Sequence, residues 1–144
     1  MPKQNFANHR RFVPMYHYVL TLLVLIALVG SLVNVYRALG RGSGRIEAIV
    51  VLLLVVIALI EGYYLRVFPL KAQDRVIRAE ENFRHYLLHG APLDPELDIR
   101  QIIGLRFAAD EELGPLAQRA VKEKLSENDI KKAIENWRGD HYRA

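Results

Sequence analysis

The fold is decided by a run of 19 residues without a charged side chain, YVLTLLVLIALVGSLVNVY at residues 18–36. A helix needs about 20 mainly apolar residues to cross a bilayer core of roughly 30 Å, and this run meets that length. Lys3, Arg10 and Arg11 precede it, as they would in a signal peptide, but no convincing small-residue cleavage site follows Gly30. We therefore expect residues 18–36 to stay in the protein as a membrane span.

A second apolar run follows after a short interruption. Residues 48–60, AIVVLLLVVIALI, are apolar at every position, and their continuation to Leu65 gives a second span at residues 46–65. The intervening segment RALGRGSGR, residues 37–45, is polar and glycine-rich, which is typical of a tight turn between antiparallel helices. The two runs are flanked by tyrosines, as an interfacial aromatic belt would be: Tyr16, Tyr18, Tyr36, Tyr63 and Tyr64. The sequence thus predicts an all-α membrane protein built on a transmembrane hairpin.

Basic residues are concentrated beside the expected spans. The basic and aromatic segment at residues 1–17 has three basic groups and no acid, and residues 62–78 have four basic groups and one acid. Residues 79–144, by contrast, have 10 basic and 13 acidic groups. This distribution suits anionic lipid head groups and argues against a nucleic-acid partner. Because the two flanks together carry more positive charge than the turn, we expect both termini in the cytoplasm.

The helical pattern continues beyond the second span. Apolar residues recur at alternating spacings of four and three at Ala72, Val76, Ala79, Phe83 and Tyr86. This spacing predicts an amphipathic juxtamembrane helix over residues 66–89, with Pro69 expected to kink or interrupt it. Glycine and proline then indicate a linker at residues 90–97, GAPLDPEL. Val76 and Phe83 are candidate contacts for the tail or for a partner.

The tail, residues 98–144, carries signals for three short helices. Asp98 with Gln101 resembles a capping box, and Ser126 with Asp129 starts the last helix. The middle helix has an apolar stripe at Leu113, Leu116, Ala117, Ala120 and Val121. The last helix is expected to place on one face Ile130, Ala133, Ile134 and Trp137. Three such short helices bury little core alone, so we expect them to pack on the amphipathic helix or on a partner.

Three consecutive acids precede the middle helix, in LRFAADEEL at residues 105–113. Acids in a first helical turn meet free backbone amides and the positive end of the helix dipole. Adjacent residues also point in different directions around a helix, so the three carboxylates do not converge on one substrate. We therefore interpret Asp110, Glu111 and Glu112 as a helix start and not as a catalytic cluster.

Several segments together resemble a family of small bacterial membrane proteins known only as a domain of unknown function. They are QNFANHRRFVPMYHYV, KAQDRVIRAEE, IRQIIGLRFAADEEL and IKKAIENWRGDHYR, of which QDRVIR with LRFAADEEL is the most specific part. The resemblance covers nearly the whole chain and implies two membrane helices followed by a helical cytoplasmic tail. With its bacterial origin it also implies the inner membrane. It implies no activity and no catalytic residue.

Glu61 is the most distinctive single residue. If the second span uses about 20 residues, Glu61 lies a turn inside the bilayer, where an ionisable group is a candidate for function. If the span instead ends at Ile60, Glu61 meets the head groups, close to Arg66. We expect the second arrangement more than the first.

Two further patterns are weaker. Small residues spaced by four at Ala27 with Ser31 and at Ala58 with Gly62 allow close helix packing within the spans. The stripe of Glu81, His85 and His89 at four-residue spacing has the form of a metal-binding face, but no fourth ligand is evident. We expect no metal and no other cofactor, and the sequence has no cysteine to bind either.

These observations predict a non-enzymatic membrane protein that serves as an accessory or scaffolding subunit of a larger inner-membrane complex. Its expected partners are the lipid bilayer and either other membrane subunits or further copies of itself. The alternative is a transport or ion-coupling component in which Glu61 acts inside an oligomeric pore.

Overall fold

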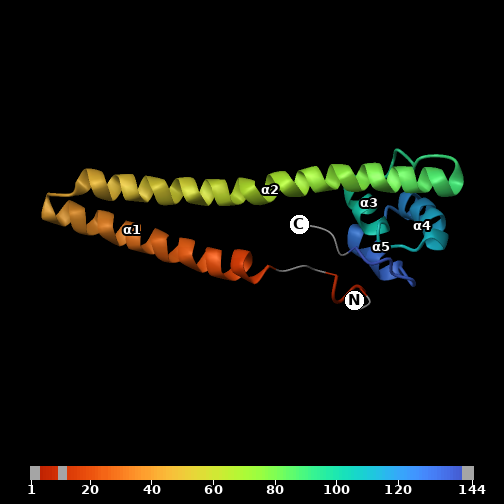
Figure 1. Cartoon of the computed structure of the whole chain (residues 1–144), viewed down its shortest axis with the longest axis horizontal. Coiled ribbons are helices and arrows are strands. Elements are labelled where there is room, and N and C mark those ends of the chain that lie inside the picture. The colour runs from red at the N-terminus through yellow and green to blue at the C-terminus, as the bar shows by residue number, and fades with distance from the viewer. Residues whose placement is uncertain (1–3, 10–12, 141–144) are drawn as a thin grey trace. The chain divides into compact units, whose positions relative to one another are not determined.

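A computed structural model describes residues 4–9 and 13–140, and within them every regular element is helical (Figure 1). A short π-helical turn precedes five α-helices: η1 (Met15–Leu20), α1 (Thr21–Arg41), α2 (Arg45–His89), α3 (Ile99–Leu105), α4 (Asp110–Glu123) and α5 (Glu127–Ala133). The expectation of an all-α chain is therefore confirmed. The basic residues at the start of the chain lie outside the described residues: Lys3, Arg10 and Arg11.

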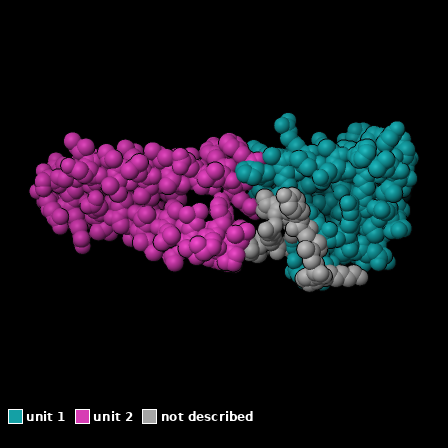
Figure 2. All heavy atoms as spheres, viewed as in Figure 1, with its two compact units in different colours: residues 1–10, 69–144 teal, residues 11–68 magenta. Residues whose placement is uncertain are grey.

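The chain divides into two compact units (Figure 2). One unit consists of residues 11–68, and the other combines residues 1–10 with residues 69–144. We call the first the hairpin unit and the second the tail unit. The helix α2 contributes its first part to the hairpin unit and its last part to the tail unit.

The hairpin unit is formed by η1, α1 and the first half of α2. Two left-handed glycines, Gly42 at φ 76° and Gly44 at φ 72°, make the turn between α1 and α2. Most of the large apolar side chains of both helices are exposed, whereas small residues beside the turn, Ala38 and Ala48, are buried. Both α1 with its preceding turn and α2 are long and apolar enough to cross a membrane.

The second helix continues beyond the apolar run, as expected, and Pro69 does not interrupt it. Pro69 lies inside α2, yet the helix runs without a break from Arg45 to His89. A proline lacks one backbone donor and crowds the carbonyl four residues earlier, and the hydrogen bonds of the neighbouring turns hold the helix through it. The expected span and its amphipathic extension thus belong to one continuous helix. Gly90, at φ 73°, ends the helix, and its N–H donates to the Tyr86 carbonyl at 2.8 Å.

The tail unit has its own hydrophobic core beneath α2. The largest fully buried side chains are Phe107, Leu105, Leu113 and Ile130, and Ile77 of α2 joins the same cluster. Figure 1 shows α3, α4 and α5 gathered beside the last part of α2. The expected packing of the tail helices on this helix is thus present. The apolar stripe of α4 faces the core, with Leu113 and Ala120 fully buried.

Local capping sets the starts of α3 and α5. The Asp98 carboxylate accepts from the Gln101 N–H at 2.7 Å while the Gln101 side chain accepts from the Asp98 N–H at 3.0 Å, which completes the expected capping box. The Ser126 hydroxyl accepts from the Asp129 N–H at 3.2 Å. Both helix starts expected from the sequence are confirmed.

The last helix is shorter than its apolar pattern suggests. The pattern places Trp137 on a helical face with Ile130, but α5 ends at Ala133 and Ile134 is extended. Trp137 instead forms an isolated β-bridge with Ala108, and its ring lies 5.1 Å from the ring of Phe107. The helical prediction was wrong for Ile134 and Trp137. Both side chains reach the core from an extended backbone, so their apolar character did not require a helix.

The short N-terminal segment at residues 4–9 packs on the tail unit. His9 is buried, and its ring lies 5.9 Å from that of Phe107 and 5.8 Å from that of Trp137. Its Nδ1 donates to the Phe6 carbonyl at 2.7 Å. The side-chain amide of Gln4 donates to the Asp140 carbonyl at 3.1 Å and accepts from the Asp140 N–H at 2.8 Å. The chain segment before the first apolar helix and the chain end after the second therefore share one folded unit.

Candidate functional site

A partly buried cluster of charges joins α2 to α4 in the tail unit. The Arg84 guanidinium donates to the Asp110 carboxylate at 2.5 and 2.7 Å, to the Glu81 carboxylate at 3.0 Å and to the Ala108 carbonyl at 2.8 Å. The Arg84 side chain is only 11% exposed, and that of Glu81 6%. Arg138 approaches the other oxygen of Glu81 at 3.5 Å. This arrangement is held in place by four hydrogen bonds from one planar, permanently charged group.

The electrostatics of this cluster are dominated by the burial of Glu81. Burial raises the pKa of the Glu81 carboxyl above its ordinary value, although Arg84 and Arg138 act in the opposite direction. Desolvation of the carboxylate therefore outweighs its two ion pairs. The cluster lies on the face of α2 that docks on the tail, and the free-energy cost of keeping Glu81 charged there rises with pH.

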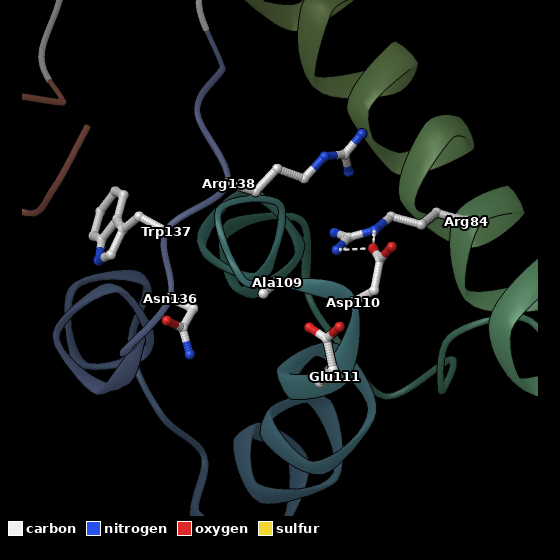
Figure 3. A pocket seen from close by; sticks show the side chains of 7 residues that line it. All are labelled: Arg84, Ala109, Asp110, Glu111, Asn136, Trp137 and Arg138. Atoms are coloured by element: carbon white, nitrogen blue, oxygen red, sulfur yellow. Dashed lines mark hydrogen bonds and ion pairs between the residues drawn. The ribbon is translucent and has the colours of Figure 1, made fainter. Parts of the chain in front are cut away.

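An open cavity of about 420 Å³ lies beside this cluster and is lined by Arg84, Ala109, Asp110, Glu111, Asn136, Trp137 and Arg138. Figure 3 shows Asp110 turned toward Arg84 and joined to it, with Glu111 at the start of the same helix. The lining residues include no histidine, serine, threonine or tyrosine. The wall of the cavity is polar: Arg84 pairs with Asp110, Arg138 approaches Glu81, and Glu111 adds a second lining carboxylate.

The three consecutive acids have three different environments. All three lie in the first turn of α4, as expected. Asp110 pairs with Arg84, whereas Glu112 accepts hydrogen bonds from the Asn136 N–H at 2.8 Å and from the Glu135 N–H at 3.2 Å. Glu111 lines the cavity. The acids thus fasten α4 to α2 on one side and to the chain after α5 on the other.

The apolar stripe of α2 lies on a different face from the one that docks. Val76 is 53% exposed, Phe83 62% and Tyr86 54%, whereas Ile77 and Glu81 are buried against the tail. The tail therefore packs on the face that carries Ile77, Glu81 and Arg84, and the face with the regular apolar pattern stays open. Of the three candidate contacts in the tail, Trp137 alone packs against its core.

Glu61 lies on α2 within the hairpin unit, and its side chain is exposed. It makes no ion pair with Arg66 or with any other residue that the structure describes. The carboxylate therefore projects from the helix at the edge of the apolar segment.

The four small candidate packing residues of the hairpin unit have unequal environments. Ser31 is buried, and its hydroxyl donates to the Leu28 carbonyl at 2.8 Å. Gly62 is half-buried, and its carbonyl accepts from the Tyr16 hydroxyl at 3.1 Å, which links the two ends of the hairpin unit. Ala27 and Ala58 are exposed. In each small-residue pair, one member is thus exposed and the other is at least half-buried.

The three side chains of the expected metal-binding stripe, Glu81, His85 and His89, have different contacts. Glu81 belongs to the charge cluster, and the His85 Nδ1 donates to the Ala91 carbonyl at 2.7 Å. The His89 ring lies against Gly114, and a Cβ added to Gly114 would be 2.8 Å from the His89 Nε2. No group of three metal-ligating side chains is found in residues 4–9 and 13–140.

Comparison with known proteins finds one match. A family model described as "Family of unknown function (DUF6526)" matches residues 1–144. The chain belongs to this family. No curated protein and no solved structure matches it.

In this DUF6526 chain the charge cluster is the part of the site that the sequence conceals. The pair Glu81 and Arg84 has the three-residue spacing of helix neighbours and could have been noticed. The third member, Asp110, lies 26 residues from Arg84 along the chain, and no local pattern connects the two. Long-range ion pairs of this kind are found only when the helices are seen packed together.

Proposed function

We propose that this DUF6526 protein is a non-enzymatic integral membrane protein that acts as an accessory or scaffolding subunit of a larger inner-membrane complex. Residues 18–36 and 46–65 cross the bilayer, and the tail unit lies on the cytoplasmic side. The observation that carries this proposal is the exposure of nearly all large apolar side chains on α1 and on the first half of α2. Such surfaces are stable in lipid or against another apolar helix, not in water.

Two features support the topology. Residues 4–9 pack on the tail unit, and a two-span chain brings its N-terminal segment and its tail to the same side of the membrane. The basic residues of the juxtamembrane part of α2 favour the cytoplasmic side, where anionic lipids attract them. The binding surface offered to other subunits is then the exposed face of α2 and the open faces of the spans.

The test uses the absence of native cysteine. Single cysteines are introduced at Ser43 in the turn and at Glu96 in the linker, both of which are exposed, and a membrane-impermeant thiol reagent is added to intact spheroplasts. We expect labelling of Ser43→Cys in intact spheroplasts and labelling of Glu96→Cys only after lysis. Equal labelling of both variants before lysis would contradict a two-span topology, and release of the chain by alkaline carbonate would contradict membrane integration.

A second candidate function is favoured by the exposed and unpaired carboxylate of Glu61. In an oligomer, such a carboxylate at the edge of the apolar segment can bind a proton or a cation. Glu61→Gln keeps the size of the side chain and removes its charge. Loss of function with assembly intact would favour this candidate, whereas an unchanged phenotype would eliminate it.

A further inference from the structure

The exposed stripe of α2 in the tail unit has the spacing of a coiled-coil seam. Its residues occupy two kinds of heptad position, with Val76 and Phe83 at a and with Ala72, Ala79 and Tyr86 at d. The tail packs on Ile77, Glu81 and Arg84 instead. At 3.6 residues per turn, these docked residues are centred about 150° around the helix from the seam. One face of α2 is therefore used for folding, and the opposite face is left without a partner within the described residues.

The chemistry of the flanks indicates what covers the seam. Arg75 lies at the g position before Val76, and Glu80 lies at the e position after it. Both are exposed, and neither makes an ion pair with another described residue. In a parallel pair of helices, a g residue faces the e residue that lies five positions later in the partner. Arg75 of each copy is therefore opposite Glu80 of the other copy. The seam is thus complementary in charge to itself.

Membrane insertion supplies the orientation that this pairing needs. Two copies inserted in the same direction carry their second spans, and hence the continuations of α2, in parallel. We propose that α2 forms a parallel two-stranded coiled coil with the α2 of a second copy through the seam at residues 72–86. This inference rests on the proposed membrane topology and identifies a partner of the α2 face, a second copy of this chain.

The composition of the seam fits a helix partner better than a lipid surface. Ala72 and Ala79 allow close approach of two backbones, and Phe83 and Tyr86 add apolar area at the distal end. A lipid-binding stripe is normally flanked by basic residues on both sides, whereas here Glu80 flanks one side. Two heptads are too short to pair stably by themselves. Anchoring in one membrane raises the effective concentration and makes so short a seam sufficient.

The experiment is disulfide crosslinking of the full chain in its native membranes after an alkaline carbonate wash. Ala79→Cys places a thiol in the seam, and Arg78→Cys places one at the neighbouring exposed position outside it. A disulfide needs Cβ atoms about 3.5–4.5 Å apart. In the proposed pair the two seam positions face each other and come close to this distance, whereas the two outer positions point away from each other. With a mild oxidant we expect Ala79→Cys to form a dimer of twice the chain mass and Arg78→Cys to remain a monomer.

A charge exchange tests the register of the same seam. Arg75→Glu in the Ala79→Cys background is expected to lower crosslinking roughly fivefold, and the addition of Glu80→Arg is expected to restore it. Intrinsic fluorescence of Trp137, the single tryptophan, measured on each purified variant in mild detergent, verifies that the tail is folded. Equal crosslinking of Ala79→Cys and Arg78→Cys would refute the seam, as would no crosslinking of either.

Two other outcomes separate this inference from the proposed function. If Ala79→Cys in washed membranes is crosslinked to a different protein and not to itself, the second copy is refuted and the proposed accessory role stands. If the carbonate wash removes the chain from the membrane, the proposed topology fails, and the parallel pairing that depends on it fails with it.

Discussion

Replacement of Arg84 by methionine tests whether the partly buried charge cluster holds the tail on α2. Methionine keeps much of the apolar length of the side chain and removes its five donors. Glu81 then stays buried with Arg138 alone, at 3.5 Å, and the Ala108 carbonyl loses its partner. Asp110 is 59% exposed and is rehydrated at little cost. The effect of the substitution is therefore governed by Glu81.

The loss of unfolding free energy in Arg84→Met has an upper limit. Loss of one partner of a buried ion pair costs about 3–5 kcal/mol. A buried carboxylate can escape this penalty by taking up a proton, and at pH 7 that costs about 3.7 kcal/mol for a group of ordinary pKa. We expect Arg84→Met to lower the free energy of unfolding by about 3 kcal/mol at pH 7, of which about 1 kcal/mol belongs to the Ala108 carbonyl.

The same reasoning fixes the dependence on pH. Burial raises the pKa of Glu81 in the folded state, so the fold favours the protonated carboxyl. The stability that this group contributes is complete below its unfolded pKa and is lost as the pH rises through the folded pKa. Removal of Arg84 raises that pKa further, because Arg84 acts to lower it. The deficit of Arg84→Met is therefore expected to shrink to about 1–2 kcal/mol at pH 5, where protonation costs only about 1 kcal/mol.

Urea unfolding of the full chain in a mild detergent, followed by the fluorescence of Trp137, measures this deficit. With a slope of about 1.5 kcal/mol per M, 3 kcal/mol moves the midpoint by about 2 M. Glu81→Gln combined with Arg84→Met should recover all but about 1 kcal/mol, because no charge is then left buried. Arg100→Met is the matched control, since Arg100 is 71% exposed and its pair with Glu127 spans 3.6 Å. A deficit below 1 kcal/mol at pH 7, or one independent of pH, would refute the reasoning.

Two further substitutions test local features of the tail with the same assay. Gly104→Ala should destabilise the tail by about 1–2 kcal/mol, because the added Cβ would lie 3.1 Å from the Glu127 carbonyl oxygen. This overpacking exceeds the gain in helix propensity from alanine. A stabilised variant would show that α3 and α5 can move apart. Ser126→Ala should cost about 1 kcal/mol, because the amide of Asp129 loses its cap; an unchanged midpoint would show that water replaces it.

The features that the sequence predicts well are those that depend on neighbouring residues. The starts of α3 and α5 follow from side chains that bond amides three positions away, at Asp98 and Ser126. Such contacts form whenever the helix forms, whatever surrounds it. The two apolar runs are equally local, because their length and lack of charge are properties of the chain itself. Sequence alone therefore determines where α3 and α5 start and the apolar character of the hairpin.

Only the tertiary structure decides how the last part of α2 is used. The sequence leaves open whether its periodic apolar face contacts the tail or a partner, and in the structure Val76 and Phe83 are exposed whereas Glu81 is buried. Arg84 lies on the packed face and bonds Asp110 and the Ala108 carbonyl, groups 26 and 24 residues away. Helical periodicity shows that a helix has two faces. Which face packs depends on the free energy of contacts between segments distant in sequence, and these exist only once the chain is folded.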